Sequence, residues 1–299
     1  MDHSSIVKTN LNPVMKFINR TVQFYLVLLA MIFLPNLQAQ EMNVMTFNIR
    51  YATPHDKENQ WELRKEELTD HLKVFRPDIF GLQEALKSQL DFVDQKLSNY
   101  AYFGVAREDG KESGEYSPLF YNTLKYNLIA QSTFWLAENT DCCELGWDAA
   151  HKRICTYALF EDKATKRKFW VFNTHFDHKG EVAREKSAEL ILGQIEKINQ
   201  EKFPVVLMGD FNALPNSKVI LNIKTKMKDG MEFASEDFIG TPGTFNGFDP
   251  NYPEDDRIDY IFVKDFKINS YRHLKNKRAN GLFISDHFAV MANLSFSNP

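Results

Sequence analysis

The fold of this chain is decided by the stretch Val205-Val206-Leu207-Met208-Gly209-Asp210-Phe211-Asn212-Ala213. Its apolar residues predict a buried strand, and Gly209 is expected to end that strand with a tight turn. Residues two apart point to the same side of extended backbone, so the Asp210 carboxylate and the Asn212 amide are predicted to face one pocket. A carboxylate suits a hard divalent cation, and an amide can bind a phosphate oxygen or the attacking water. The alternative is a strand followed by an ordinary Asx-turn.

The first 39 residues have the order of a secretory signal, in which basic residues precede an apolar run and a small residue. These features are Lys8, Lys16 and Arg20, the run 24–34, and Leu37-Gln38-Ala39. The run is short for a membrane span, and a membrane anchor is the alternative. We therefore predict a signal peptide over residues 1–39, with Met15 as an alternative start, and one exported domain over residues 40–299. We expect that domain to be periplasmic or extracellular, without stable membrane insertion.

The charge of the predicted mature chain argues against a general attraction to polyanions. Residues 1–39 contain three of the 36 basic residues and one of the 40 acidic residues, which leaves a net charge of −6. Such a chain has no general basic field for nucleic acid or anionic membrane. Dense basic clusters occur only at 163–168 and 275–278.

Three cysteines, Cys142, Cys143 and Cys155, cannot all pair within one chain. In an oxidising compartment, one bridge can join Cys155 to either of the other two. Three free thiols are the alternative. No C-x-x-C spacing indicates a zinc site.

Apolar periodicity predicts many strands and few helices. The clearest helix is 181–199, and further helical patterns cover 61–75 and 86–97. Strands are expected at 42–49, 78–84, 100–106, 119–121, 126–132, 154–161, 169–174, 258–263, 266–274 and 289–296, besides the stretch quoted above. Strands alternate with helices only in part, so we predict an α/β fold with two sheets in the core and helices outside.

Polar side chains recur where these apolar strands end. They are Asn48, Glu84, His175, Asp210 with Asn212, Asp259, and Asp286 with His287. Each has an ordinary structural explanation, such as a cap, a satisfied core histidine or a buried salt bridge. Together they indicate a site at the edge of a rigid sheet.

These residue types suit the hydrolysis of a phosphoester. A divalent ion held by a few carboxylates, without a dedicated all-protein cage, describes a magnesium site. Histidines supply general acid and base, and each needs an acidic partner that fixes its tautomer. Glu115 and Asp259 are available as such partners.

Seven motifs in order resemble the endonuclease/exonuclease/phosphatase superfamily, which includes pancreatic deoxyribonuclease I, abasic-site endonucleases, inositol polyphosphate phosphatases and bacterial sphingomyelinases. The motifs are Phe47-Asn48-Ile49-Arg50, Gln83-Glu84, Gly114-Glu115-Tyr116, Asn173-Thr174-His175, Gly209-Asp210-Phe211-Asn212, Ile258-Asp259-Tyr260 and Ser285-Asp286-His287. The resemblance spans about residues 44–290. It implies a four-layer αββα sandwich, in which two packed, mostly antiparallel sheets are flanked by helices and carry the site at one end.

The resemblance also implies a metal site. Glu84 would be the main ligand, supported by Asp286, Asn48 and Asp210. The expected cofactor is Mg²⁺, with Mn²⁺ or Ca²⁺ as alternatives, and one or two ions remain open.

The resemblance implies catalytic roles for His175, Asp210, Asn212, Asp259, His287 and Glu115. Asp210 and Asn212 would orient the attacking water and the phosphate. His287 would contact the scissile phosphate or act as base, oriented by Asp259, and His175 would pair with Glu115. Asn48 and Arg50 would face the substrate. The basic Arg50 argues against abasic-site endonuclease activity.

Further residues resemble a bacterial branch of metal-dependent hydrolases. They are Trp61 with Arg64, Gly146-Trp147-Asp148 and His175-Phe176-Asp177-His178. Trp147, Asp177 and His178 would shape the substrate pocket, or are an ordinary core aromatic residue and loop polar residues.

We therefore expect a secreted, monomeric, divalent-metal-dependent phosphodiesterase or phosphomonoesterase. The acidic charge and the extra residues near the site favour a small phosphoester over long duplex DNA, because Asp177 beside the phosphate would repel a polyanion. The alternatives are a secreted nuclease like deoxyribonuclease I and a binding module that kept the fold without activity.

Overall fold

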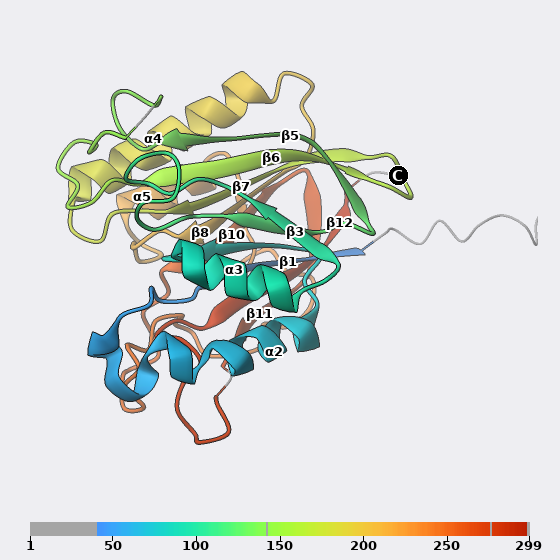
Figure 1. Cartoon of the computed structure of the whole chain (residues 1–299). Coiled ribbons are helices and arrows are strands. Elements are labelled where there is room, and N and C mark those ends of the chain that lie inside the picture. The colour runs from blue at the N-terminus through green and yellow to red at the C-terminus, as the bar shows by residue number, and fades with distance from the viewer. Residues whose placement is uncertain (1–40, 142, 276, 298–299) are drawn as a thin grey trace, which may run out of the picture. The chain divides into compact units, whose positions relative to one another are not determined.

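The computed structural model describes residues 41–141, 143–275 and 277–297 (Figure 1). The predicted signal peptide, its alternative start and its cleavage site lie outside the described residues.

Two six-stranded sheets form the centre of the described unit. The first has the order β11 (Phe266–Leu274), β12 (Ala289–Phe296), β1 (Glu41–Asn48), β2 (Ile79–Gln83), β4 (Leu119–Asn122) and β3 (Tyr100–Phe103). The second has the order β5 (Tyr126–Trp135), β6 (Ile154–Asp162), β7 (Lys168–His175), β8 (Val205–Asp210), β10 (Asp259–Lys264) and β9 (Lys228–Asp229). In each sheet one neighbouring pair is parallel, β1 with β2 and β7 with β8, and the other pairs are antiparallel.

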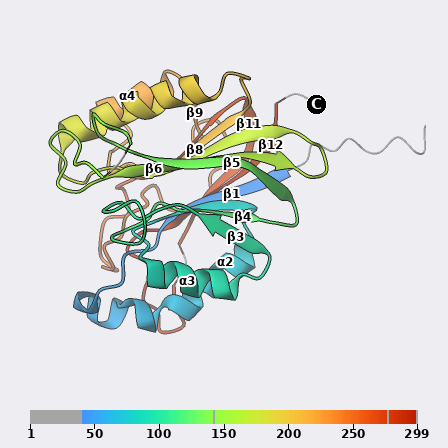
Figure 2. The same cartoon turned by 45° about the horizontal axis from the view of Figure 1, so that its top comes forward.

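Helices cover the outer face of each sheet (Figure 2). The first sheet is covered by α2 (Lys65–Phe75) and α3 (Lys87–Lys96), and two 3-10 helices, η1 (Pro54–Asn59) and η2 (Trp61–Leu63), precede α2. The second sheet is covered by α4 (Glu181–Ile198) and α5 (Lys218–Lys224). This arrangement confirms the predicted four-layer sandwich. None of the described helices combines the length and apolar character that crossing a membrane requires.

The strand β8 illustrates why the apolar run is continuous. Met208 faces the first sheet and packs near Val44, whereas Leu207 faces outward and packs near Ile191 of α4. A strand covered on both faces needs apolar residues at successive positions. The same covering explains why β8 is central to the fold.

Gly209 lies inside β8 and does not end it, so that expectation was wrong. Its φ is 149°, and a Cβ atom there would lie 2.0 Å from the carbonyl oxygen of Thr174 on the paired strand β7. Glycine is therefore required for the close approach of the two parallel strands.

The helix predicted over 61–75 is interrupted at Arg64, whose φ of −128° is not helical. The guanidinium is buried and donates to the carbonyl oxygens of Asn59, Ile49 and Arg50 at 2.8, 2.6 and 2.8 Å. A buried cation needs such partners. Arg64 thereby fixes the backbone that follows β1, where the site begins.

Both alternatives for the cysteines were wrong. Cys155 is a buried free thiol in β6, so it forms no bridge to either of the other cysteines. Cys143 is disulfide-bonded, which excludes three free thiols.

Candidate active site

The ends of five strands meet at one edge of the two sheets. In the first sheet Asn48, the last residue of β1, lies opposite Gln83, the last residue of β2. In the second sheet His175 of β7 lies opposite Asp210 of β8, and Asp210 lies opposite Asp259 of β10. Neighbouring strands are separated by about 4.8 Å, so this register lines up the predicted polar residues in rows.

A cleft of about 610 Å³ opens at this edge. The predicted site residues that line it are Arg50, Glu84, Glu115, His175, His178, Asp210, Asn212, Asp286 and His287. Asn48 and Asp259 lie beneath it and bond to lining residues. The structure thus brings together most of the set that the strand ends predicted.

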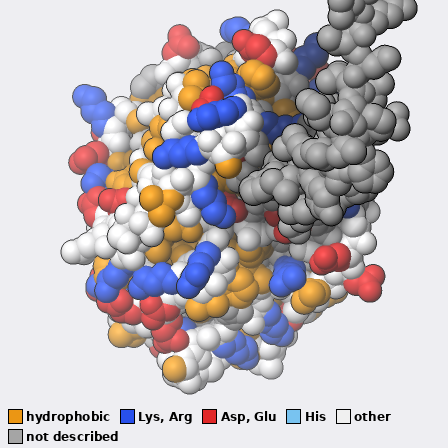
Figure 3. All heavy atoms as spheres, turned by 90° about the vertical axis from the view of Figure 1, so that its right-hand side faces the viewer, with side chains coloured by type: hydrophobic (Ala, Val, Ile, Leu, Met, Phe, Trp, Pro, Cys, Tyr) orange, Lys and Arg blue, Asp and Glu red, His pale blue; other side chains and the backbone are white. Residues whose placement is uncertain are grey.

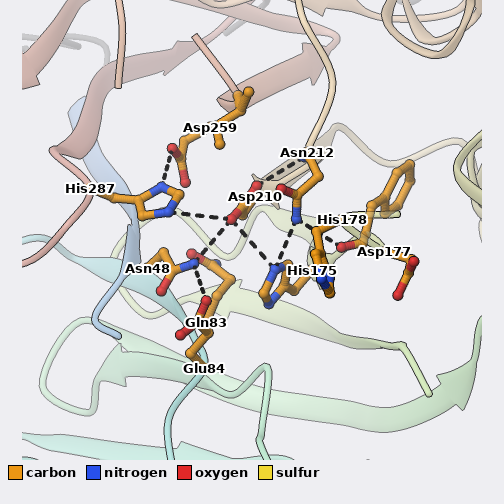
Figure 4. Close-up of polar contacts among 12 residues, drawn as sticks. Asn48, Gln83, Glu84, His175, Asp177, His178, Asp210, Asn212, Asp259 and His287 are labelled. Atoms are coloured by element: carbon orange, nitrogen blue, oxygen red, sulfur yellow. Dashed lines mark hydrogen bonds and ion pairs between the residues drawn. The ribbon is translucent and has the colours of Figure 1, made fainter. Parts of the chain in front are cut away.

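Asn48 joins the acidic groups of the two sheets (Figure 4). Its Nδ2 donates to Glu84 Oε1 at 3.1 Å and to Asp210 Oδ2 at 3.0 Å. Its Oδ1 accepts the backbone N–H of Arg50 at 3.0 Å. Asn48 therefore presents N–H groups to Glu84 and Asp210 and positions both acids.

His287 and Asp259 form a buried acid–histidine pair. His287 Nδ1 donates to Asp259 Oδ2 at 2.8 Å, and His287 Nε2 lies 3.8 Å from Asp210 Oδ2. Burial lowers the pKa of His287, but the Asp259 and Asp210 carboxylates outweigh burial and raise that pKa to about 10. His287 is therefore an imidazolium at neutral pH, with Nε2 on the cleft side.

Asp210 is buried between these groups. Burial, followed by the charge of Asp259, raises the pKa of Asp210 to about 7. Its Oδ1 accepts the backbone N–H of Asn212 at 2.9 Å. This bond forms an Asx-turn. The Asx-turn expected as the alternative and the predicted pocket therefore both occur at this stretch.

His175 is the second histidine of the site. Its Nε2 accepts the Asn212 amide N–H at 3.1 Å and lies 3.5 Å from Asp210 Oδ2. Burial and nearby arginines lower the pKa of His175, so the ring is neutral. Within the described part of the chain, no hydrogen bond or ion pair joins His175 to Glu115.

The predicted pairing of His175 with Glu115 is therefore wrong. Both oxygens of Glu115 accept from the Arg107 guanidinium, at 2.7 and 2.9 Å. A bidentate arginine–carboxylate pair matches the fork geometry of both groups, so Arg107 fixes the orientation of the Glu115 carboxylate.

Three residues of the site have left-handed backbone. The φ angles of Arg50, Glu84 and Asn212 are 57°, 61° and 46°. Non-glycine residues adopt this region at a free-energy cost of about 1–3 kcal/mol each, and such residues cluster at functional sites. With this backbone conformation, the side chains of all three residues line the cleft.

The acids on the first sheet fit a divalent cation. Arg50 Nη1 lies 3.8 Å from Glu84 Oε2, and Arg50 Nε lies 3.9 Å from Asp286 Oδ2. Burial raises the pKa of Asp286, and the negative charge of Glu84 raises it further, although His287, Arg50 and Arg64 act in the opposite direction. Hard carboxylate oxygens are the ligands that Mg²⁺ prefers. Glu84, Asp286 and Asp210 can hold it.

Arg50 also pairs with Asp56, through two contacts of 3.1 Å. The guanidinium therefore lies between three carboxylates while still lining the cleft. Asp210, Asp259 and His287 form a second cluster with ligand atoms within 4.8 Å of one another, but this cluster could hold a cation only after His287 loses its proton.

Of the three residues predicted to shape the pocket, only His178 lines it. Trp147 is half-buried, donates its backbone N–H to Glu138 at 3.3 Å and does not line the cleft. Asp177 is buried below the cleft, where its carboxylate accepts backbone N–H groups from two loops. Burial alone would raise the pKa of Asp177, but these donors outweigh burial and lower it.

Sequence reasoning missed Arg107, His151 and Arg153, which line the same cleft. The predicted set contains mainly polar residues that follow strands, and Arg153 does not follow one. Arg153 directly precedes β6, which is antiparallel to β7, so the beginning of β6 lies at the same edge as the end of β7. Polar residues before antiparallel strands are the signal that would have found it.

This fold and this set of acids, histidines and amides define a phosphoester hydrolase of the αββα type. The chain belongs to the endonuclease/exonuclease/phosphatase family, whose model matches residues 45–287. Members of this family are phosphoester hydrolases that typically use a divalent metal.

Solved structures support the assignment over most of the chain. An endonuclease/exonuclease/phosphatase from Bacteroides vulgatus is 41% identical, with a TM-score of 0.82, and the match covers 86% of this chain and 99% of that one. The Bacteroides thetaiotaomicron mannosyl-6-phosphatase is 34% identical, with a TM-score of 0.80, over 85% and 100% of the two chains. Protein L388 of Acanthamoeba polyphaga mimivirus is 26% identical over 84% of this chain and 98% of its own.

Proposed function

We propose that this chain is an exported, Mg²⁺-dependent phosphatase that hydrolyses a small phosphate monoester. The observation that carries the proposal is the Asn48 amide, which holds Glu84 and Asp210 together beside the His287–Asp259 pair. The likeness to the mannosyl-6-phosphatase supports a monoester over a diester.

Asp210, His287 and Asn212 have different roles in the proposed hydrolysis. Asp210, with a pKa of about 7, can accept a proton from the attacking water near neutral pH. The His287 imidazolium donates from Nε2 to an oxygen of the phosphate and stabilises the charge that develops there. The Asn212 amide, fixed by the Phe176 carbonyl at 3.0 Å, limits where that phosphate can lie. When bound by Glu84 and Asp286, Mg²⁺ would polarise the phosphate.

The positions of the basic clusters support a small substrate over duplex DNA. The cluster at 163–168 occupies the turn from β6 to β7, whereas the site lies at the other end of β7. An eight-residue strand separates them by about 23 Å. Figure 3 shows the face at the right of Figure 1, where Lys and Arg side chains lie among apolar ones. In the second cluster, Arg278 is buried against Asn59 and the Glu58 carbonyl.

A substrate panel tests the proposal. Purified residues 40–299 would be assayed with Mg²⁺ at physiological salt against sugar phosphates, other phosphomonoesters, small phosphodiesters and plasmid DNA. We expect turnover of monoesters that Glu84→Gln abolishes and that Glu189→Gln, a change at an exposed acid on α4, leaves intact. Plasmid nicking without turnover of small esters would establish the nuclease alternative. Absence of turnover on every substrate would favour the binding-module alternative.

Export is a separate part of the proposal and has its own test. The order of charged, apolar and small residues in 1–39 supports a cleaved signal. N-terminal sequencing of protein from the native envelope or medium should give a chain that begins near residue 40. A mature chain that begins before residue 30 would overturn this part.

A further inference from the structure

One wall of the cleft is cationic and has no role in the mechanism above. It consists of Arg107, His151, Arg153 and His178, and we call it the cationic wall. All four residues line the cleft, and they come from the loop after β3, the residues before β6 and the loop after β7. Three chain segments distant in sequence therefore place basic groups at one position.

Arg153 is the centre of the cationic wall. Its side chain is only 5% exposed, yet it lines the cleft. Its Nη2 donates to His178 Nδ1 at 3.3 Å, and its Nε lies 3.4 Å from Asp177 Oδ2. Its Nη1 has no hydrogen-bond partner among the described residues. Burying a guanidinium with unused donors costs free energy unless a ligand or a water molecule accepts hydrogen bonds from them.

The negative charges near the cationic wall are already engaged. Glu115 is held by Arg107 in the bidentate pair described above. Asp177 accepts backbone N–H groups of Ala150, His151, Lys179 and Gly180 at 2.8–3.1 Å. Burial, followed by the charge of Arg107 for His151 and of Arg153 for His178, lowers the pKa values of these two histidines. Asp177 therefore divides its charge among four backbone donors and Arg153, and Arg153 Nη1 keeps N–H groups that no described residue accepts.

The geometry of the cationic wall is fixed before any ligand arrives. The Asp177 carboxylate ties the loop at 150–151 to the loop at 179–180 through those four backbone bonds. The rings of His151 and His178 stack with centroids 5.6 Å apart and planes 19° apart. A preorganised set of donors binds a ligand without further ordering. Asp177 was expected to face the substrate and repel a polyanion, and this expectation was wrong. Its carboxylate instead holds the two loops together.

The cationic wall is displaced from the reacting centre. Figure 4 shows His178 on the side of His175 away from His287. The acids that fit a cation, Glu84 and Asp286, lie instead around Arg50. A phosphate between the cation position and His287 would leave the wall free for another group of the same substrate.

We propose that the cationic wall is a subsite for a second anionic group of the substrate, either a carboxylate, a sulfate or another phosphate. The substrate class is then a small phosphate monoester that carries an additional negative charge. This inference rests on the proposed function for its choice of substrate. Guanidinium and imidazole N–H groups are the donors that recognise such oxyanions.

Matched pairs of substrates test the inference. Glycerol 3-phosphate would be compared with 3-phosphoglycerate, and glucose 6-phosphate with 6-phosphogluconate, because each second member adds a carboxylate at a different separation. We expect the wild type to favour the acidic member of at least one pair by tenfold or more in kcat/KM, mainly through KM. Arg153→Gln should reduce that preference to near one and change turnover of the neutral member less than threefold. Lys152→Gln, which removes a neighbouring charge held by Glu108, should keep the preference.

Two results would overturn the inference. One is equal kcat/KM for both members of each pair in the wild type. The other is an equal loss on both members in Arg153→Gln, since Arg153 would then act on the scissile phosphate itself. If Arg153→Gln does not fold, as judged by circular dichroism and melting temperature, His178→Gln makes the same test from the exposed side of the wall.

A binding measurement separates this inference from the proposed function. Melting temperature would be followed during titration of wild type and Arg153→Gln with 3-phosphoglycerate or glycerol 3-phosphate in EDTA. Selective stabilisation of the wild type by 3-phosphoglycerate would support the subsite even if no phosphoester were turned over. Equal stabilisation by both compounds would count against the subsite even if the enzyme were an active phosphatase.

Discussion

Replacing Asp210 by Asn should stabilise the metal-free protein above neutral pH while it removes activity. Asp210 is 1% exposed, and burial together with Asp259 raises its pKa from 3.8 to about 7. The folded state therefore binds more protons than the unfolded state between these pH values. By linkage, the ionised carboxylate makes stability fall as pH rises from about 4 to about 7.

The expected size follows from the shift. About three pKa units correspond to about 4 kcal/mol of destabilisation at pH 8, because one unit corresponds to about 1.4 kcal/mol. Asn removes that penalty but loses one acceptor, since Asn48 Nδ2 donates to Asp210 Oδ2. The Asn48 N–H left without its acceptor subtracts about 1–3 kcal/mol, whereas the attraction to His287 is already included in the pKa shift. A net gain of about 1–3 kcal/mol at pH 8 should remain and should disappear near pH 5.

His287 contributes to stability with the opposite sign. Its folded pKa of about 10 lies above the ordinary value of 6.5, so its contribution is complete below pH 6.5 and is lost as pH rises through about 10. Most of that contribution comes from Asp259, which the substitution leaves in place. The difference in unfolding free energy between wild type and Asp210→Asn from pH 5 to pH 8 therefore reports mainly on Asp210.

Urea unfolding in EDTA at pH 5, 6.5 and 8 would measure the free energies of unfolding of both proteins. The control is Asp229→Asn, a substitution of equal burial at an acid paired with Arg257 through contacts of 3.0 and 2.7 Å. Breaking that pair should destabilise by about 3–5 kcal/mol. Our reasoning is refuted if wild type exceeds Asp210→Asn in stability at pH 8, or if their difference does not change with pH.

Three further predictions concern metal, catalysis and packing. Glu84→Gln should weaken Mg²⁺ binding, measured by calorimetry, and lower turnover on the order of 10²-fold or more; unchanged Mg²⁺ affinity would contradict the metal assignment. His287→Gln should lower kcat on the order of 10²- to 10⁴-fold without unfolding the protein, and full activity would remove His287 from the mechanism. Gly81→Ala should destabilise by about 1–3 kcal/mol in urea, because the new Cβ would lie 2.4 Å from the Asn173 side chain. Gly193→Ala on α4, whose Cβ meets nothing within 4 Å, should instead stabilise by about 1 kcal/mol, and similar effects of the two changes would refute the packing argument.

The sequence by itself determined the layers and the main members of the site. Local periodicity predicted α4 within one residue of its end and β12 with its observed bounds. The polar residues after apolar strands, such as Asn48 and His175, could be predicted to converge because strand ends share an edge of a sheet. These inferences need only the side-chain period and the covering of each face.

The tertiary structure alone decided which side chains are partners. Glu115 binds Arg107 rather than His175, because a nearby guanidinium satisfies both of its oxygens. Asp177 lies beneath the cleft because four backbone N–H groups from two loops surround it. Arg153 enters the site from the beginning of a strand that pairing with β7 places at this edge. Such partners depend on register and on contacts between distant segments, which local sequence does not encode.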